Sequence, residues 1–541
     1  MIKRTILIAA LGALTIPSPA RAQAQSPDFR LTVEDAVRRA VEHNPDLTIV
    51  RLDTDVEEAR VGEARTAYTP VLSTVLARSS SATPPTNFLL GTNGIDTRDL
   101  FSSAGVRQRV PWGNGTWSVS WDAARTTSNS PLTSFDPSLQ SGFQLAFSQP
   151  LVKDRKIDAA RQQYVIAKRN QASSELRFRE AVVQTVASVK QAYWTLKALR
   201  ANVIVQERSL ELAEQLAKEN SVRVRLGQSP PLDLVQVETE VATRRENLIQ
   251  ARAAADDAED RLRRLIMDPA DTSFWQQHLD TVDEPAGRMP APDVESVVAR
   301  AMTERYDVGR ARNDVDNAAT NVEFFSNQKL PDVRLETSYR GSGLGGAQLL
   351  RTGGFPGIVT GTLNSGFGGV LGQTFGTDYP AWSFGVTVSY PLGRSFEEVS
   401  KVQAEVERRQ AAARVASLQL DVAASLRQAG RQVRSTSERE DAARAGATLA
   451  QQRLDAEQRR YDVGLSTSFL VTQAQRDLLQ AQVNFLQATL DYQSSLVNFE
   501  ALQLAPAAGA SGPVAVSGST VVAIPPQTPN GVFRAVTASQ P

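Results

Sequence analysis

The chain has 541 residues, with 59 basic and 59 acidic side chains, two histidines and no cysteine. Because the charges balance, the composition predicts no nucleic acid or other polyanion as a partner. Without cysteine there are no disulfide bonds, and neither histidine lies in a cluster of metal ligands, so we expect no metal site and no cofactor.

The first segment, residues 1–22, has the pattern of a secretory signal peptide. Lys3 and Arg4 precede a short apolar run, and Ala20-Arg21-Ala22 fits the small-residue cleavage rule. The run is too short for an ordinary membrane-spanning helix, and no later stretch resembles one. A position in a membrane would therefore require a β-barrel, since only helices and closed barrels satisfy every backbone group in lipid.

A repeat with an offset of 261 residues relates the segment after the signal peptide to a second copy in the chain. Both copies have a helical pattern that ends at a proline, and Thr32 is the expected N-cap of the first. Residues that recur at this offset include Val33, Ala40, Asp46 and Pro70, which fall on Val294, Ala301, Asp307 and Pro331.

After each of these prolines the spacing of apolar residues changes from helical to alternating. In the second half Val333, Leu335 and Tyr339 alternate with polar residues, and a second alternating run follows at 382–390. The roughly forty residues between these two runs are rich in glycine, serine and threonine and are expected to form a long loop. We therefore predict two strands with one apolar face each.

The first half carries corresponding strands and one additional hairpin, at about 104–124. Its turn is predicted at Gly113-Asn114-Gly115, because Asn-Gly between alternating runs is a strong turn signal. This hairpin either adds two strands to a membrane barrel or folds over the mouth of the barrel.

The longest predicted element is a helix from Leu151 to Leu226. A helix of this length would extend on the order of 100 Å at ~1.5 Å per residue, so the chain is expected to be elongated. A turn at Gly227 leads into a second helix, and a matching helical pair turns at Gly464. The heptad series that supports the first helix is Val182, Val189, Leu196, Val203, Leu210, Ala217 and Val224.

These patterns divide the chain into nine segments. They are a signal peptide (1–22), a first-repeat helix (27–70), first-repeat strands and loops (71–149), a first long helical hairpin (150–267), an equatorial connector (268–292), a second-repeat helix (293–331), second-repeat strands and loop (332–391), a second long helical hairpin (392–504) and a disordered tail (505–541).

The strands and helices together predict an assembly. Neither about four strands per chain, nor six if the additional hairpin belongs to the barrel, can close a membrane barrel, because single-chain barrels begin at about eight strands. Three copies of four strands would make twelve. The predicted fold is thus mixed α and β, with a trimeric transmembrane β-barrel continuous with a long α-helical coiled-coil tunnel, and with an internal twofold repeat.

Several motifs recur in order along the chain: Leu31-Thr32-Val33-Glu34-Asp35-Ala36, the strand entries at Pro70 and Pro331, Gln149-Pro150-Leu151 and Tyr461-Asp462-Val463-Gly464-Leu465. Through these motifs the chain to about Leu504 resembles the TolC-type outer-membrane efflux channel family. That resemblance implies a homotrimer in the outer membrane of a Gram-negative bacterium, in contact with its lipid and extending into the periplasm. It also implies two partners, a periplasmic membrane-fusion adaptor and an inner-membrane pump of the RND or ABC type.

The same resemblance implies two sets of functional residues near the helix turns. The first set would contact the adaptor and comprises Leu226, Gly227, Gly464 and Leu465. The second set would form a periplasmic gate and comprises Asp233, Asp455 and Asp462.

The sequence therefore predicts the passive exit duct of a tripartite efflux system for small molecules, gated at the helix tips. Two alternatives remain open: the same channel used for type I protein secretion, and a structural coiled-coil envelope protein without a pore. No nucleotide loop or nucleophile motif is present, so an enzyme is not expected.

Overall fold

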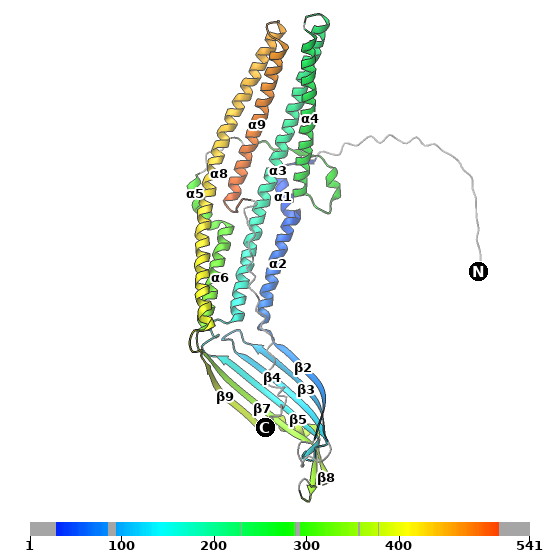
Figure 1. The fold of residues 1–541 in the computed structure, drawn as a ribbon, viewed down its shortest axis with the longest axis vertical. Helices are drawn as coiled ribbons and strands as arrows, with labels where there is room; N and C mark the ends of the chain where they lie inside the picture. Colours follow the sequence, from blue (N-terminus) through cyan, green and yellow to red (C-terminus); the bar gives the residue numbers. More distant parts are fainter. Residues whose placement is uncertain are drawn as a thin grey trace, which may run out of the picture.

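Two long helices set the shape of the chain. The computed structural model describes residues 29–84, 94–228, 230–285, 287, 293–354, 357–376 and 378–507. In it, α3 (Ala159–Arg225) and α8 (Phe396–Asp462) have 67 residues each, which is on the order of 100 Å. Figure 1 shows both running from a β-sheet to the opposite end of the molecule. The predicted signal peptide, 1–22, and residues 508–541 of the predicted tail lie outside the described residues.

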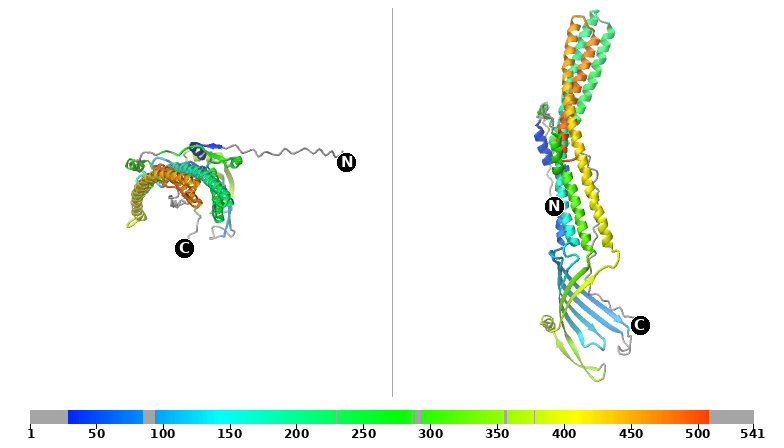
Figure 2. Two further views of the ribbon diagram at one scale, coloured as in Figure 1. Left: turned by 90° about the horizontal axis from the view of Figure 1, so that it is seen from above. Right: turned by 90° about the vertical axis from the view of Figure 1, so that its left-hand side faces the viewer.

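Each long helix is paired with a shorter one that returns toward the middle of the molecule. α4 (Pro231–Ile266) packs against α3, and α9 (Ser468–Leu502) packs against α8. Nearer the sheet, α2 (Pro45–Thr66) lies beside α3, and α6 (Tyr306–Gln328) contacts both α8 and α3. Seen from above, the helices follow an arc, so they form a curved wall with one hollow side (Figure 2).

The ends of the helices follow from their capping residues. α3 begins at Ala159 because Asp158 accepts a hydrogen bond from the backbone N–H of Arg161 at 2.7 Å. The predicted start at Leu151 is wrong, because the charged residues before this cap form turns. Thr32 is confirmed as the N-cap of α1 (Val33–His43), since its hydroxyl accepts from Asp35 N–H at 3.1 Å.

A buried tyrosine ties the beginning of the chain to the connector between its halves. Tyr193 of α3 donates a hydrogen bond to the carbonyl of Leu31 at 3.0 Å and accepts one from Asp283 N–H at 3.1 Å. Burial raises the pKa of Tyr193 to about 12, so it stays protonated at neutral pH. These bonds hold β1 (Phe29–Leu31) and its parallel partner β6 (Leu279–Thr281), which follows the 3₁₀ helix η2 (Thr272–Gln276), against α3.

The second half has its own core where the short helix α5 (Val294–Glu304) meets the long ones. Gly430 of α8 permits this approach, because a Cβ there would lie 2.5 Å from Cγ2 of Val294. The buried apolar side chains of this core are Val298, Ala301, Val308, Val422, Leu426, Ala429, Val433, Tyr492, Phe499 and Leu502.

At the other end of the molecule, antiparallel strands form one sheet in the order β2-β3-β4-β5-β7, with β9 also paired to β7 and β8 paired to the far end of β7. The two edge strands, β2 and β9, have no further strand partner within the described residues. The strands are β2 (Val71–Thr83), β3 (Ile95–Arg109), β4 (Thr116–Ser128), β5 (Phe135–Pro150), β7 (Asp332–Thr352), β8 (Ile358–Ser365) and β9 (Pro380–Ser389).

The expectation of about four strands per chain is wrong. The additional hairpin is β3–β4, and it lies within the sheet, because β3 pairs along its length with β2 and β4 pairs with β5. Its turn at Gly113 and Asn114 has the positive φ angles that this sequence favours. Six strands therefore run side by side from β2 to β9, and β8 adds a seventh at one end.

The expectation of a long loop between the two strands of the second half is also wrong. β7 continues to Thr352, and β8 and the helix α7 (Phe367–Phe375) follow. The alternation of apolar residues stops after Tyr339 because Gly341, Gly343 and Gly345 take the positions that would continue it. The glycines thus hid the strand from a pattern search.

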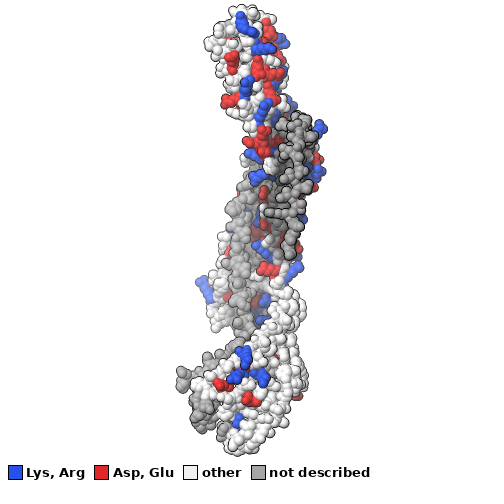
Figure 3. Space-filling view, turned by 90° about the vertical axis from the view of Figure 1, so that its right-hand side faces the viewer, with Lys and Arg blue, Asp and Glu red and all other residues white. Residues whose placement is uncertain are grey.

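The sheet has one apolar and one polar face. Directly paired residues such as Trp117 with Phe147, and Trp121 with Phe143, lie on the same face. The other face carries an ion pair between Arg340 and Asp122 at 3.2 Å. Figure 3 shows few charges on the sheet end compared with the helices. None of the helices in the described part of the chain combines the length and apolarity that a membrane span requires.

Candidate functional site

Two glycine turns form the end of the molecule farthest from the sheet (Figure 1). Gly227 has φ +73° and Gly464 has φ +78°, a left-handed conformation that glycine adopts without steric cost. In each turn two backbone bonds close a Schellman motif, such as Gln228 N–H to the carbonyl of Arg223 at 2.8 Å. The adjacent Leu226 and Leu465 side chains are 66% and 76% exposed. Both predicted adaptor-contact pairs are thus presented at the helix tips.

Just inside these tips, Tyr461 joins the two hairpins. Its ring is 3% exposed, and its hydroxyl donates to Oδ1 of Asn220 on α3 at 3.0 Å. The guanidinium of Arg223 lies 4.2 Å from the centre of the same ring. Because Tyr461 belongs to α8 while both contacts come from α3, this cluster connects the hairpin α8–α9 to the hairpin α3–α4.

The environment of Tyr461 is acidic as well as buried. Burial raises the pKa of Tyr461, and the carboxylates of Glu219, Asp233 and Asp462 raise it further, against the charge of Arg223. Two of the three predicted gate residues, Asp233 and Asp462, therefore lie close enough to act on this tyrosine.

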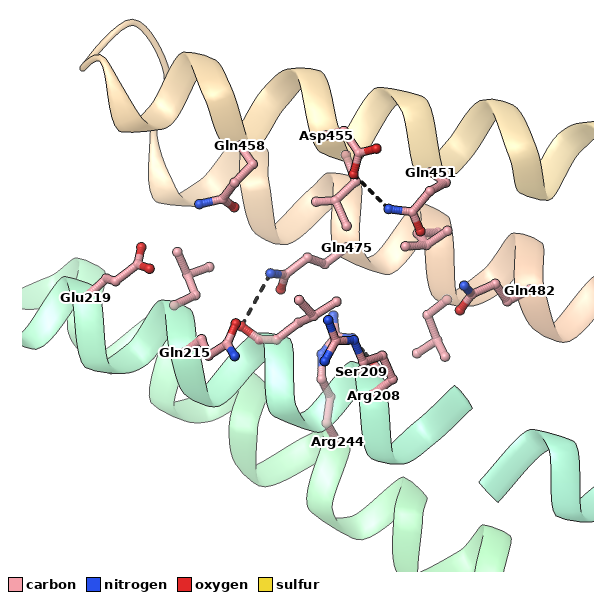
Figure 4. A pocket seen from close by; sticks show the side chains of 15 residues that line it. Arg208, Ser209, Gln215, Glu219, Arg244, Gln451, Asp455, Gln458, Gln475 and Gln482 are labelled. Atoms are coloured by element: carbon pink, nitrogen blue, oxygen red, sulfur yellow. Dashed lines mark hydrogen bonds between the residues drawn. The ribbon is translucent and has the colours of Figure 1, made fainter. Parts of the chain in front are cut away.

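The third predicted gate residue, Asp455, lies about two helical turns farther from the tip than Asp462 on α8. It lines a cavity of about 360 Å³ between the two hairpins and accepts a hydrogen bond from Gln451 at 2.8 Å (Figure 4). Asp462 instead accepts from Gln458 at 3.3 Å. A single chain does not gather the three aspartates, and no cluster of metal-ligating residues occurs within the ranges that the structure describes.

A buried charge network behind the cavity was missed by sequence reasoning. Glu240 of α4 accepts from Arg244 Nε at 3.0 Å and from Arg476 Nε of α9 at 3.0 Å. Arg244 is 1% exposed and also donates to the hydroxyl of Ser209 on α3. The network therefore fastens three helices together at one point.

The pKa values of this network follow from burial and pairing. Burial alone would raise the pKa of Glu240, but the hydrogen bonds and charges of Arg476 and Arg244 outweigh it, and the pKa lies below its ordinary value. Burial lowers the pKa of Arg244. The signal was present in the sequence, because Glu240 and Arg244 lie on the same helical stripe as the buried Val237 and Leu248.

A family model described as "Outer membrane efflux protein" matches residues 36–266 and 297–503 of the chain. No curated protein gives a significant match to the sequence.

Solved structures share the fold at low sequence identity. The CmeC outer membrane channel of Campylobacter jejuni has a TM-score of 0.62 and 15% identity, over 87% of this chain and 85% of CmeC. The outer membrane protein VceC of Vibrio cholerae has a TM-score of 0.59 and 16% identity, over 87% and 96%. The open state of the MtrE outer membrane channel of Neisseria gonorrhoeae has a TM-score of 0.58 and 16% identity, over 87% and 89%.

Proposed function

The chain belongs to the outer membrane efflux protein family, and from this premise we propose that it forms the exit duct of a tripartite efflux system for small molecules. The protein lies in the outer membrane of a Gram-negative bacterium, extends into the periplasm and is a channel protein, not an enzyme. The observation that carries the proposal is that the two ends of the molecule differ. One end is a sheet with an apolar face, the other end has two glycine turns, and helices on the order of 100 Å long join them.

The open edges of the sheet support a trimeric barrel. Unpaired backbone groups of β2 and β9 would have no partners in lipid, so β9 of one copy must pair with β2 of the next. Three copies with six strands each would close an eighteen-stranded barrel, in place of the expected twelve. The helical walls of the three copies would then enclose a tunnel, and the order of elements in each half supports an internal twofold repeat.

The tip geometry supports a passive gate. Tyr461 and Glu240 each link one hairpin to the other, so opening the tip requires these contacts to loosen. The predicted gate residues Asp233, Asp455 and Asp462 would bias a constriction toward cations. The exposed Leu226-Gly227 and Gly464-Leu465 pairs would meet the periplasmic adaptor, and an inner-membrane pump of the RND or ABC type would supply the energy.

Replacing Gly464 with valine tests whether the tip functions. A β-branched residue at φ +78° costs roughly 1–2 kcal/mol of backbone strain, while nothing lies within 4 Å of its Cβ. We expect Gly464→Val to raise drug accumulation in cells without preventing trimer assembly. The matched control is Gly446→Val, at an exposed glycine inside α8 with equal space around it.

Unchanged drug accumulation in Gly464→Val would count against a functional tip. In a deletion strain, loss of an exported protein with normal drug efflux would favour type I secretion instead. The third alternative, a coiled-coil protein without a pore, does not explain why one face of the sheet is apolar.

A further inference from the structure

The helix α7 lies flat on one face of the sheet, across β5 and β7. Cβ atoms at Gly341 and Gly343 would lie 2.2 Å and 2.1 Å from backbone carbonyls of α7, those of Thr374 and Val370. Only glycine therefore permits the helix to approach this closely. Three alternating glycines of β7, the third being Gly345, form a saddle that holds α7.

The face that carries α7 is the apolar one. Gly341 is paired with Phe143, and the ring of Phe375 at the end of α7 lies 5.5 Å from that of Phe143. Figure 2 shows the helix on the side away from the hollow of the arc. In the trimeric barrel proposed above, on which this inference rests, the side away from the hollow is the side that meets lipid.

α7 also completes an edge of the sheet that no strand covers. β9 pairs with β7 only up to Gly341, and β8 pairs with it only from Gly346 onward. In the gap between them, the backbone N–H of Leu344 donates to Oε1 of Gln373 on α7 at 3.0 Å. This bond matters most in a medium without water, where an unpaired backbone group has no alternative partner.

The composition around α7 fits hydrocarbon. No charged residue occurs between Arg351 and Asp378, a stretch that includes β8 and the whole of α7. Several large apolar or aromatic side chains of the helix and its surroundings are exposed, beside the uncharged polar Thr362 and Asn364. They include Ile358, Leu363, Phe375, Tyr379 and Trp382, all at least 59% exposed. The first charged residue after the helix is Asp378. The uncharged apolar side chains match acyl chains, and Tyr379 and Trp382 are suited to the lipid interface.

We propose that α7 is a lipid-contacting helix on the outer wall of the channel. It rests on the glycine saddle of β7, supplies Gln373 to the uncovered edge of that strand, and presents Phe375 to the acyl chains of the outer membrane. The contact adds a lipid-facing surface that the strands alone do not provide.

Spin labelling can test the proposal because the chain has no cysteine. Single variants Phe375→Cys, Leu145→Cys and Gln144→Cys would carry a nitroxide in the full-length channel, reconstituted in phospholipid vesicles. Leu145 lies on the apolar face and the adjacent Gln144 on the polar face, so they are matched lipid and water references. We expect the label at 375 to be reached by oxygen and shielded from a polar nickel chelate, as at 145 and unlike 144.

Nickel access at 375 equal to that at 144 would place α7 in water and overturn the proposal. Shielding from both reagents would also overturn it, because a second copy or another protein would then cover the helix.

A second variant tests the saddle. Gly343→Val in the Phe375→Cys background should displace α7 and at least double nickel access at 375. The same substitution in the Leu145→Cys background should leave nickel access at 145 unchanged. Gly385→Val, at a β9 glycine with open space, should change neither label. An unchanged label in Gly343→Val would show that the saddle does not hold the helix.

Discussion

At the scale of single residues, Glu240 shows how charge can fasten helices. It is 7% exposed and pairs with arginines from two helices, so removal of its charge leaves Arg244 buried without a counter-charge. Breaking a buried pair costs about 3–5 kcal/mol, whereas an exposed pair contributes about 0–1 kcal/mol. Whether an ion pair is buried between helices or exposed on their surface therefore decides how much it contributes to stability.

We predict that Glu240→Gln lowers the stability of the solubilised channel by about 3 kcal/mol at pH 7. Because the pKa of Glu240 is depressed in the folded state, its contribution is present above the ordinary glutamate pKa of about 4 and is lost as the pH falls through the folded value. The difference in the free energy of unfolding between Glu240→Gln and the unchanged channel should therefore become smaller in strong acid. Thermal unfolding of both proteins at a series of pH values measures this difference.

The control for this prediction is Glu211→Gln, which removes an exposed pair with Arg208 and should change stability by less than about 0.5 kcal/mol. Equal effects of the two substitutions, or a Glu240→Gln effect that does not depend on pH, would contradict the account.

Sequence reasoning reached some of these residues and missed others for physical reasons. The tip glycines follow from helix-ending turns that only glycine forms freely, so the pattern identified them. The family resemblance, together with their place near the turns, indicates Asp233 and Asp462 as gate residues. Nothing local indicates that both act on Tyr461, because that depends on how two distant hairpins pack. Taken alone, Glu240 resembles an exposed acidic residue on a helix. Its spacing from the buried Val237 and Leu248 of α4 indicates that it is buried as well.

At the scale of elements, glycines mark where one element approaches another. Gly430 and Gly446 lie in the same helix, α8, yet only Gly430 meets a neighbour, Val294 of α5. The same close approach occurs where α7 packs on Gly341, Gly343 and Gly345 of β7. The spacing of apolar side chains indicates a strand only where such side chains are present. The end of β7 carries glycines instead, because α7 packs there, and so the loop predicted for this region was wrong.

We predict opposite effects for two matched substitutions in α8. Gly446→Ala should stabilise the chain by up to about 1 kcal/mol, the helix propensity of alanine over glycine. Gly430→Ala should gain the same propensity but overpack against Val294 at a cost of about 1–3 kcal/mol, a net loss. Chemical unfolding of both variants measures the difference, and identical shifts would show that α5 does not pack as described.

At the scale of the whole molecule, the length was predictable from sequence, because a 67-residue helix fixes its own length. The placement of strands at one end and glycine turns at the other was predictable too, because the long helices separate them in the sequence. The number of strands was not, because a hairpin that extends the sheet and one that folds over it have the same alternation. Pairing of β3 with β2, and of β4 with β5, decided between them. In the trimer proposed above, six strands per chain would form a wider barrel, and therefore a wider pore, than four strands per chain.

The central claim is that three copies form one gated duct. Single-channel recording in planar bilayers, together with native mass measurement of the same purified sample, tests it most directly. We predict a trimer that is mostly closed at rest, with cation-biased openings. A monomer, or an oligomer of any size with no conductance at any voltage, would contradict it.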